Sequence, residues 1–164
     1  MNNKLIGIGT TLFAFCVFLA NPLEVNAKSH EPILSDEIVS MCDEIGEMYG
    51  ICSELLQAMI EKESTGNPDA VNGGCIGLMQ IFQKYHLERM ERLGVTDLFD
   101  PYSNILVGAD YISELAEKHG DVALVLMVYH GESKAFENDR NGIISSYAKW
   151  ILERSEELER EHGK

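Results

Sequence analysis

The chain has 164 residues, with 27 acidic against 13 basic side chains and a formal net charge of −14 at pH 7. Nucleic acids and anionic membrane surfaces are therefore poor partners, because phosphate contacts need clustered Lys and Arg. Such a charge suits solubility outside the cell. The five histidines are scattered and no cysteines show the paired spacing of a zinc site, so we expect no metal and no cofactor.

The first 27 residues are typical of a secretory signal peptide. Lys4 precedes a mainly apolar run over 5–20, and Val25-Asn26-Ala27 supplies small residues for cleavage. We predict cleavage after Ala27, a linker over 28–34, one domain over 35–164, and a secreted protein. A retained N-terminal membrane anchor is the alternative, although the run is short for a membrane span.

Cys42, Cys52 and Cys75 remain after this cleavage. An odd number of cysteines in a secreted chain leaves at least one thiol unpaired. One disulfide is possible, and the sequence does not decide which two cysteines would form it.

The predicted elements are all helical, because apolar residues recur at helical spacing and no segment alternates as a strand would. Val122–Tyr129 is apolar all round and should be the buried central helix. The mixed-charge tail 153–164 should fray into a solvated surface helix. The sequence therefore predicts one all-α domain. Caps, prolines and glycines place the expected helices at 35–50, 53–66, 77–83, 84–93, 100–120, 121–131 and from about Ile143 to Ile151. We expect Ile144 to be buried in the last of these helices. Residues 67–76 should form a polar loop.

The helix that Ser53 is expected to cap carries a carboxylate on its apolar side. At 100° per residue, Glu54, Gln57 and Glu61 form a polar stripe, whereas Glu63 falls on the opposite side. Burial disfavours the charged form, so the pKa of Glu63 should be raised. A carboxylic acid that stays protonated near neutral pH can act as a general acid. The alternative is a helix-end glutamate that turns to solvent, with Glu61 as the ordinary carboxylate for comparison.

Several short motifs follow one another along the chain: Glu63-Ser64, Asn67-Pro68, Ala70, Gly74, Gly77-Leu78-Met79-Gln80, Asp100-Pro101, Asn104-Ile105, Gly108, Tyr111, Tyr129, Gly131 and Tyr147. In this order and spacing they resemble the lysozyme-like lytic transglycosylases of the soluble-lytic-transglycosylase type. The resemblance extends roughly from Ile38 to Ile151, nearly the whole mature chain.

This resemblance implies a peptidoglycan lytic transglycosylase with a single catalytic carboxyl group. Glu63 would protonate the glycosidic oxygen between N-acetylmuramic acid and N-acetylglucosamine. As a carboxylate it would then accept the proton of the muramic acid O6 hydroxyl, so that a 1,6-anhydro sugar forms without water. Ser64 would form a hydrogen bond near the acid, Gln80 would line the sugar-binding cleft, and Met79 would form part of its apolar floor.

By the same resemblance, Tyr129 and Tyr147 would lie against the cleft, where the family's tyrosines help to hold the catalytic carboxyl. The chain departs from the family at His130, where Asn is usual. His130 would either replace that Asn in the contacts with substrate or titrate near the acid. Two other departures are Cys75, where Ala is common, and Phe82-Gln83, where a Pro is often found.

Other functions stay open at this point. A hydrolase on the same scaffold, similar to goose-type lysozyme, would deliver water in place of O6. A non-catalytic component that binds or assembles the wall would keep the cleft without turnover, and His130 leaves this possibility open. Asp69 lies close enough in sequence to be a partner carboxylate, although its loop cannot be oriented.

The expected partners are the glycan strands of peptidoglycan. Small single-domain members of this family also serve secretion, conjugation or phage machines that need the wall opened locally, and the size of this chain suits that use by analogy. We expect a monomer associated with the cell wall.

Overall fold

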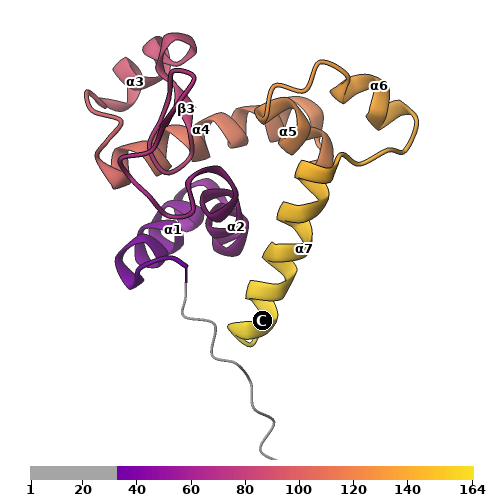
Figure 1. Ribbon diagram of the computed structural model, residues 1–164, viewed down its shortest axis with the longest axis horizontal. Coiled ribbons are helices and arrows are strands. Elements are labelled where there is room, and N and C mark those ends of the chain that lie inside the picture. Colours follow the sequence, from indigo (N-terminus) through magenta and orange to yellow (C-terminus); the bar gives the residue numbers. More distant parts are fainter. Residues whose placement is uncertain (1–32) are drawn as a thin grey trace, which may run out of the picture. The chain divides into compact units, whose positions relative to one another are not determined.

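The computed structural model describes residues 33–164, so the predicted signal peptide and most of the linker lie outside the described residues. No helix within 33–164 has both the length and the apolar character needed to cross a membrane. Within this part of the chain, helices dominate (Figure 1). In order, the elements are α1 Asp36–Tyr49, α2 Ser53–Ser64, β1 Val71–Asn72, β2 Cys75–Ile76, β3 Ile81–Phe82, a 3-10 turn η1 Gln83–Tyr85, α3 Leu87–Leu93, α4 Pro101–His119, α5 Val122–Tyr129, α6 Ala135–Arg140 and α7 Ser146–Glu161.

Side chains cap the N-termini of four helices. An oxygen of each capping residue accepts a hydrogen bond from the backbone amide three residues later, a donor that the helix itself leaves free. The capping residues are Ser35, Asp100, Asp121 and Ser145. The prediction that Ser53 caps α2 is wrong, because the N-cap is Cys52 and the Ser53 hydroxyl donates instead to Asp43.

The core joins helices that are distant in sequence. α1 packs on both α2 and α4, and α5 packs against α4 and α7. The middle of α5, from Ala123 to Met127, is buried, which confirms the prediction of a buried central helix. α7 lies beside α2 (Figure 1), so the last helix of the chain covers the helix that carries Glu63.

The predicted helix over 77–83 is wrong, and so is the expectation of no strands. Residues 71–82 form a three-stranded antiparallel sheet in the order β1-β2-β3, with Val71 opposite Ile76 and Cys75 opposite Phe82. Strands of two residues are too short to show an alternating pattern in sequence. The predicted helix over 84–93 also starts later, at Leu87, after η1.

The turn between β2 and β3 is fixed by a buried amide. Asn104 of α4 accepts a hydrogen bond from the Met79 amide at 2.8 Å and donates to the Ile76 and Leu98 carbonyls at 2.9 and 2.8 Å. Gly77 lies in the left-handed region with φ +77°, and a side chain there would collide with the Asn104 amide. This contact between distant segments, rather than local helix propensity, decides the conformation of 77–80.

The C-terminal segment differs most from the prediction. α7 starts at Ser146 rather than near Ile143, and Ile144 is exposed rather than buried. The tail does not fray, because the helix continues to Glu161 and buries Leu158. The short helix α6 was not predicted.

The polar stripe of α2 is buried rather than solvated. Glu54, Gln57 and Glu61 are only 1, 2 and 7% exposed, because α7 covers them with charged side chains. Arg154 Nε lies 2.7 Å from the Glu61 carboxylate, and Lys164 Nζ lies 2.7 Å from that of Glu54. Glu61, chosen as the ordinary carboxylate for comparison with Glu63, is thus buried and paired with Arg154.

Candidate active site

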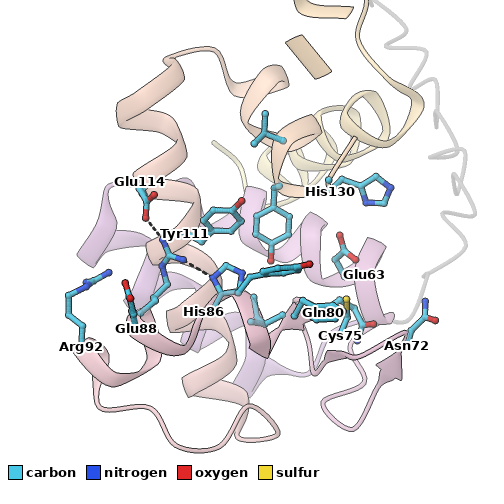
Figure 2. Close-up of a pocket in the computed structure, with 17 residues that line it drawn as sticks. Glu63, Asn72, Cys75, Gln80, His86, Glu88, Arg92, Tyr111, Glu114 and His130 are labelled. Carbon is cyan, nitrogen blue, oxygen red and sulfur yellow. Dashed lines mark hydrogen bonds and ion pairs between the residues drawn. The ribbon is translucent and has the colours of Figure 1, made fainter. Parts of the chain in front are cut away.

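A cleft of about 930 Å³ is lined by residues of α2, the small sheet, η1, α3, α4 and α5 (Figure 2). Glu63 and His130 lie on one side of it. Glu88, Arg92 and Glu114 lie on the other side. The two sides differ in chemistry. The side of Glu88, Arg92 and Glu114 carries paired charges, whereas the other side carries the carboxyl group of Glu63.

Glu63 lies at the C-terminal end of α2, half-buried, with its carboxyl group in the cleft. Burial raises the pKa of Glu63, as expected from its place on the apolar side of the helix. The hydroxyl of Tyr147 donates a hydrogen bond to its carboxylate and, with the charge of His130, moderates this rise. A carboxyl group in this setting holds its proton to higher pH than an exposed glutamate does.

Tyr147 is brought to Glu63 by the start of α7. The capping residue Ser145 accepts a hydrogen bond from the Ala148 amide and donates one at 2.6 Å to Glu132, in the segment after α5. The ring of Tyr147 is 7% exposed. His130 stacks on that ring, with centroids 3.8 Å apart and planes 12° from parallel. His130 is itself exposed and lines the cleft.

Tyr129 has a different partner from the one that the resemblance implied. Its hydroxyl donates to the Met79 carbonyl at 2.8 Å, and its ring packs against Tyr111 with centroids 5.5 Å apart. Tyr129 lines the cleft, as the resemblance implied, and its hydroxyl holds the turn, whereas the hydroxyl of Tyr147 contacts the carboxyl of Glu63.

The remaining predicted residues lie around this turn. Gln80 lines the cleft, and its side-chain amide donates to the Ala70 and Gly77 carbonyls at 3.2 and 3.0 Å. Met79 is fully buried, with its sulfur against Gly108, and supports the cleft from below without lining it. The Ser64 hydroxyl donates to the Ile60 carbonyl of its own helix rather than to Glu63.

Asp69 is exposed, and its backbone amide bonds to the Asn67 side chain. It does not line the cleft. Among the described residues that do, the other carboxylates are Glu88 and Glu114, on the side opposite Glu63. Glu63 therefore has no neighbouring carboxylate within the described cleft wall.

The sequence did not reveal the cleft wall formed by η1 and α3. Its residues include Tyr85 and Arg89, next to Phe82 of β3, and Arg89 pairs with Asp110 of α4 at 2.7 Å. Because these contacts join segments about twenty residues apart, no periodic pattern in the sequence could predict them. The departure at Phe82 from the family's usual Pro was the one local signal.

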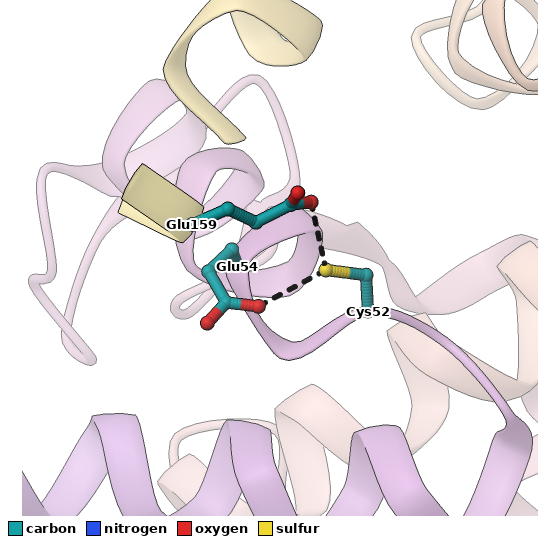
Figure 3. Close-up of side chains that lie close together, drawn as sticks. All are labelled: Cys52, Glu54 and Glu159. Atoms are coloured by element: carbon teal, nitrogen blue, oxygen red, sulfur yellow. Dashed lines mark hydrogen bonds between the residues drawn. The ribbon is translucent and has the colours of Figure 1, made fainter. Parts of the chain in front are cut away.

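The three described cysteines are free thiols, so the possible disulfide among Cys42, Cys52 and Cys75 is not formed. Cys52 lies beside Glu54 and Glu159 (Figure 3), and their ligand atoms fall within 4.8 Å of one another, close enough to hold a metal ion. Burial, followed by hydrogen bonds to both carboxylates, raises the pKa of Cys52 to about 11. The Cys52 thiol donates hydrogen bonds to Glu54 and Glu159 here, whereas a metal ion would bind the deprotonated thiolate.

Comparisons with known proteins agree with this geometry. Residues 40–150 match the model of the family described as Transglycosylase SLT domain. Invasion protein IagB of Salmonella typhimurium is 31% identical over 120 residues, which cover 68% of this chain and 72% of IagB. A transglycosylase of Enterobacteria phage PRD1 is 37% identical over 84 residues, which cover 51% of this chain and 30% of the phage protein.

Among solved structures, an inactive mutant of lytic transglycosylase Slt from Pseudomonas aeruginosa matches with a TM-score of 0.65 at 20% identity. The match covers 76% of this chain and 24% of Slt. At that identity the likeness concerns the fold alone. This chain therefore spans under a third of both the phage protein and Slt, and most of IagB.

Proposed function

Because the chain belongs to the transglycosylase SLT-domain family, we propose that it is a lytic transglycosylase acting on peptidoglycan. The observation that carries the proposal is Glu63, a half-buried carboxyl with a raised pKa that faces the cleft and bonds to Tyr147. Relatives named membrane-bound lytic murein transglycosylases support the same activity.

In the first chemical step, protonated Glu63 donates its proton to the glycosidic oxygen as the bond between N-acetylmuramic acid and N-acetylglucosamine breaks. The Tyr147 hydroxyl then stabilises the carboxylate that remains. The sugar's own N-acetyl group relieves the positive charge at C1, because no second carboxylate lies beside Glu63 to do so.

In the second step, Glu63 accepts the proton of the muramic acid O6 hydroxyl while O6 forms a bond to C1. The product is a 1,6-anhydro sugar, Glu63 is protonated again, and no water is consumed. Gln80 and His130 contact the glycan from the cleft wall. Ser64 and Met79 keep Glu63 and the turn in place from behind that wall.

Mass spectrometry of muropeptides released from purified sacculi by residues 28–164 tests this proposal. Anhydro-muramic acid ends are expected. New reducing ends instead would identify a hydrolase similar to goose-type lysozyme. Binding to sacculi without any release would identify a non-catalytic wall component. Activity that persists in Glu63→Gln would show that the carboxyl is misassigned.

We further propose that residues 1–27 direct secretion and that the mature chain is a monomer that opens the wall locally. Two relatives point to such settings by their names, since one is an invasion protein and the other belongs to a phage. N-terminal sequencing of the exported protein is expected to begin at Lys28. Light scattering is expected to give the mass of one chain. A retained N-terminus would favour a membrane anchor.

A further inference from the structure

Two aromatic side chains in the cleft wall have no part in the proposed proton transfers. Phe82 and Tyr85 both line the cleft, with ring centroids 5.0 Å apart and planes tilted by 32°. Tyr85 is 74% exposed, more than any other large hydrophobic side chain in the described part of the chain. An aromatic ring left in water inside a cleft offers a ligand substantial apolar area to bury.

The pair is held in a fixed position by the fold. Phe82 belongs to β3, opposite Cys75 of β2, and its ring lies so close to Gly74 that a side chain there would come within 3.1 Å. The 3-10 turn η1 follows directly. Side chains three residues apart eclipse one another in such a turn, which brings Tyr85 alongside Phe82.

The same strand pair connects the rings to the acid. Cys75 lines the cleft (Figure 2). Glu63 lines the same cleft and lies on the same side of it as Cys75 (Figure 2), and burial, then the charge of Glu63, raise the pKa of the Cys75 thiol. Phe82 pairs with Cys75 across the two strands, so the aromatic pair follows Glu63 and Cys75 along the same cleft wall.

The chemistry of the pair fits an uncharged sugar. The face of an aromatic ring is electron-rich, and one face of a β-linked pyranose presents polarised C–H groups that pack against it. Lys84 Nζ lies over the Tyr85 ring, 5.7 Å from its centroid. The ammonium therefore stands over one face of the ring, where it can donate to sugar hydroxyl oxygens.

We propose that Phe82 and Tyr85 form a subsite that binds one N-acetylhexosamine ring of the glycan, next to the ring that Glu63 acts on. The identity of the glycan rests on the proposed function. The subsite belongs to a segment where the chain departs from its family, since Phe82-Gln83 stands where a Pro is often found.

Calorimetric titration with soluble β-1,4-linked N-acetylglucosamine oligomers tests the subsite in a Glu63→Gln background, where no turnover occurs. Tyr85→Ala is expected to weaken binding about three- to tenfold, the size of one aromatic contact. Tyr85→Phe keeps the ring and should bind within about twofold of its parent. Leu87→Ala is the matched control, because Leu87 is also exposed but does not line the cleft.

Equal affinity of Tyr85→Ala and its parent would overturn the subsite, and so would equal weakening by Leu87→Ala. Thermal unfolding of each variant checks that the exposed substitutions leave the fold intact. In the active background, Tyr85→Ala should raise KM on sacculi and preserve kcat. A failure of the proposed function is distinguishable, because it would alter the products or the effect of Glu63→Gln and leave the binding comparison standing.

Discussion

Both sides of α2 carry carboxyl groups that are buried or half-buried, and the groups that contact these carboxyls differ between the two sides. On the side toward α7, Arg154 contacts Glu61, and His162 and Lys164 contact Glu54. On the side toward the cleft, the carboxyl of Glu63 meets the neutral hydroxyl of Tyr147. One side of the helix thus joins two helices by ion pairs, and the other presents an acid to a cavity.

The difference shows that burial alone does not make a carboxyl group reactive. Burial would raise the pKa of Glu54, but hydrogen bonds from Lys164, Cys52 and His162 outweigh it and bring that pKa to about 2. Burial does raise the pKa of Glu63, because its main partner is uncharged. A carboxyl group prepared to donate a proton is therefore one that is buried without a contacting cation.

The largest expected effect separates two glutamates that lie two residues apart. Glu63→Gln should reduce the release of muropeptides by about a thousandfold or more, because it removes the proton donor. Glu61→Gln should keep nearly full specific activity and lower stability. Turbidity assays on sacculi, normalised to folded protein by circular dichroism, measure both. A comparable loss of activity in Glu61→Gln would contradict the division of α2 into two functional sides.

Arg154→Ala should be the most damaging change to stability on the side toward α7. It leaves Glu61, 7% exposed, without its cation, and an unpaired buried charge costs about 2–4 kcal/mol. Urea unfolding monitored by circular dichroism measures the loss. Arg160→Ala is the control. The pair of Arg160 with Glu156 is exposed, so this substitution should lower the free energy of unfolding by less than about 0.5 kcal/mol. Equal effects of the two substitutions would show that the pair with Glu61 is not special.

The acid dependence of stability should report on Glu54. Its pKa is about 2 in the folded state against an ordinary 4.5, so the stabilisation is complete above 4.5 and is lost as pH falls toward 2. Because its cationic partners are partly exposed, we expect about 1–2 kcal/mol at neutral pH. Unfolding free energies of the parent and Glu54→Gln should therefore converge on acidification. If the difference in unfolding free energy between the parent and Glu54→Gln stayed constant with pH, the lowered pKa of Glu54 would not be its cause.

The smallest expected effect concerns the pH profile of the cleft. Burial raises the pKa of Glu63, and the hydrogen bond from Tyr147 and the charge of His130 oppose that rise. His130→Asn should raise the pKa of Glu63 further. The pH above which kcat/KM declines should therefore rise, by less than about one unit. His119→Asn, at a histidine outside the cleft wall, should leave the profile unchanged. A shift to lower pH would contradict the assignment.

The sequence was sufficient for features encoded within one helix. The apolar side of α2 led to Glu63, and the apolar run at 122–129 led to the central helix. Features that need two distant segments were missed. The stripe of Glu54 and Glu61 looked solvated because its cations lie about a hundred residues later. The turn before Gln80 looked helical because Asn104, which fixes it, lies in another helix.

The bond between Tyr147 and Glu63 joins residues 84 positions apart. During synthesis, a chain emerging from the ribosome therefore exposes its carboxyl long before the hydroxyl that contacts it. The side chains that pair with Glu61 and Glu54, those of Arg154, His162 and Lys164, follow Tyr147 in the chain. The residues that line the cleft run from Glu63 to Gly131, so all of them are synthesised before Tyr147, the partner of the acid.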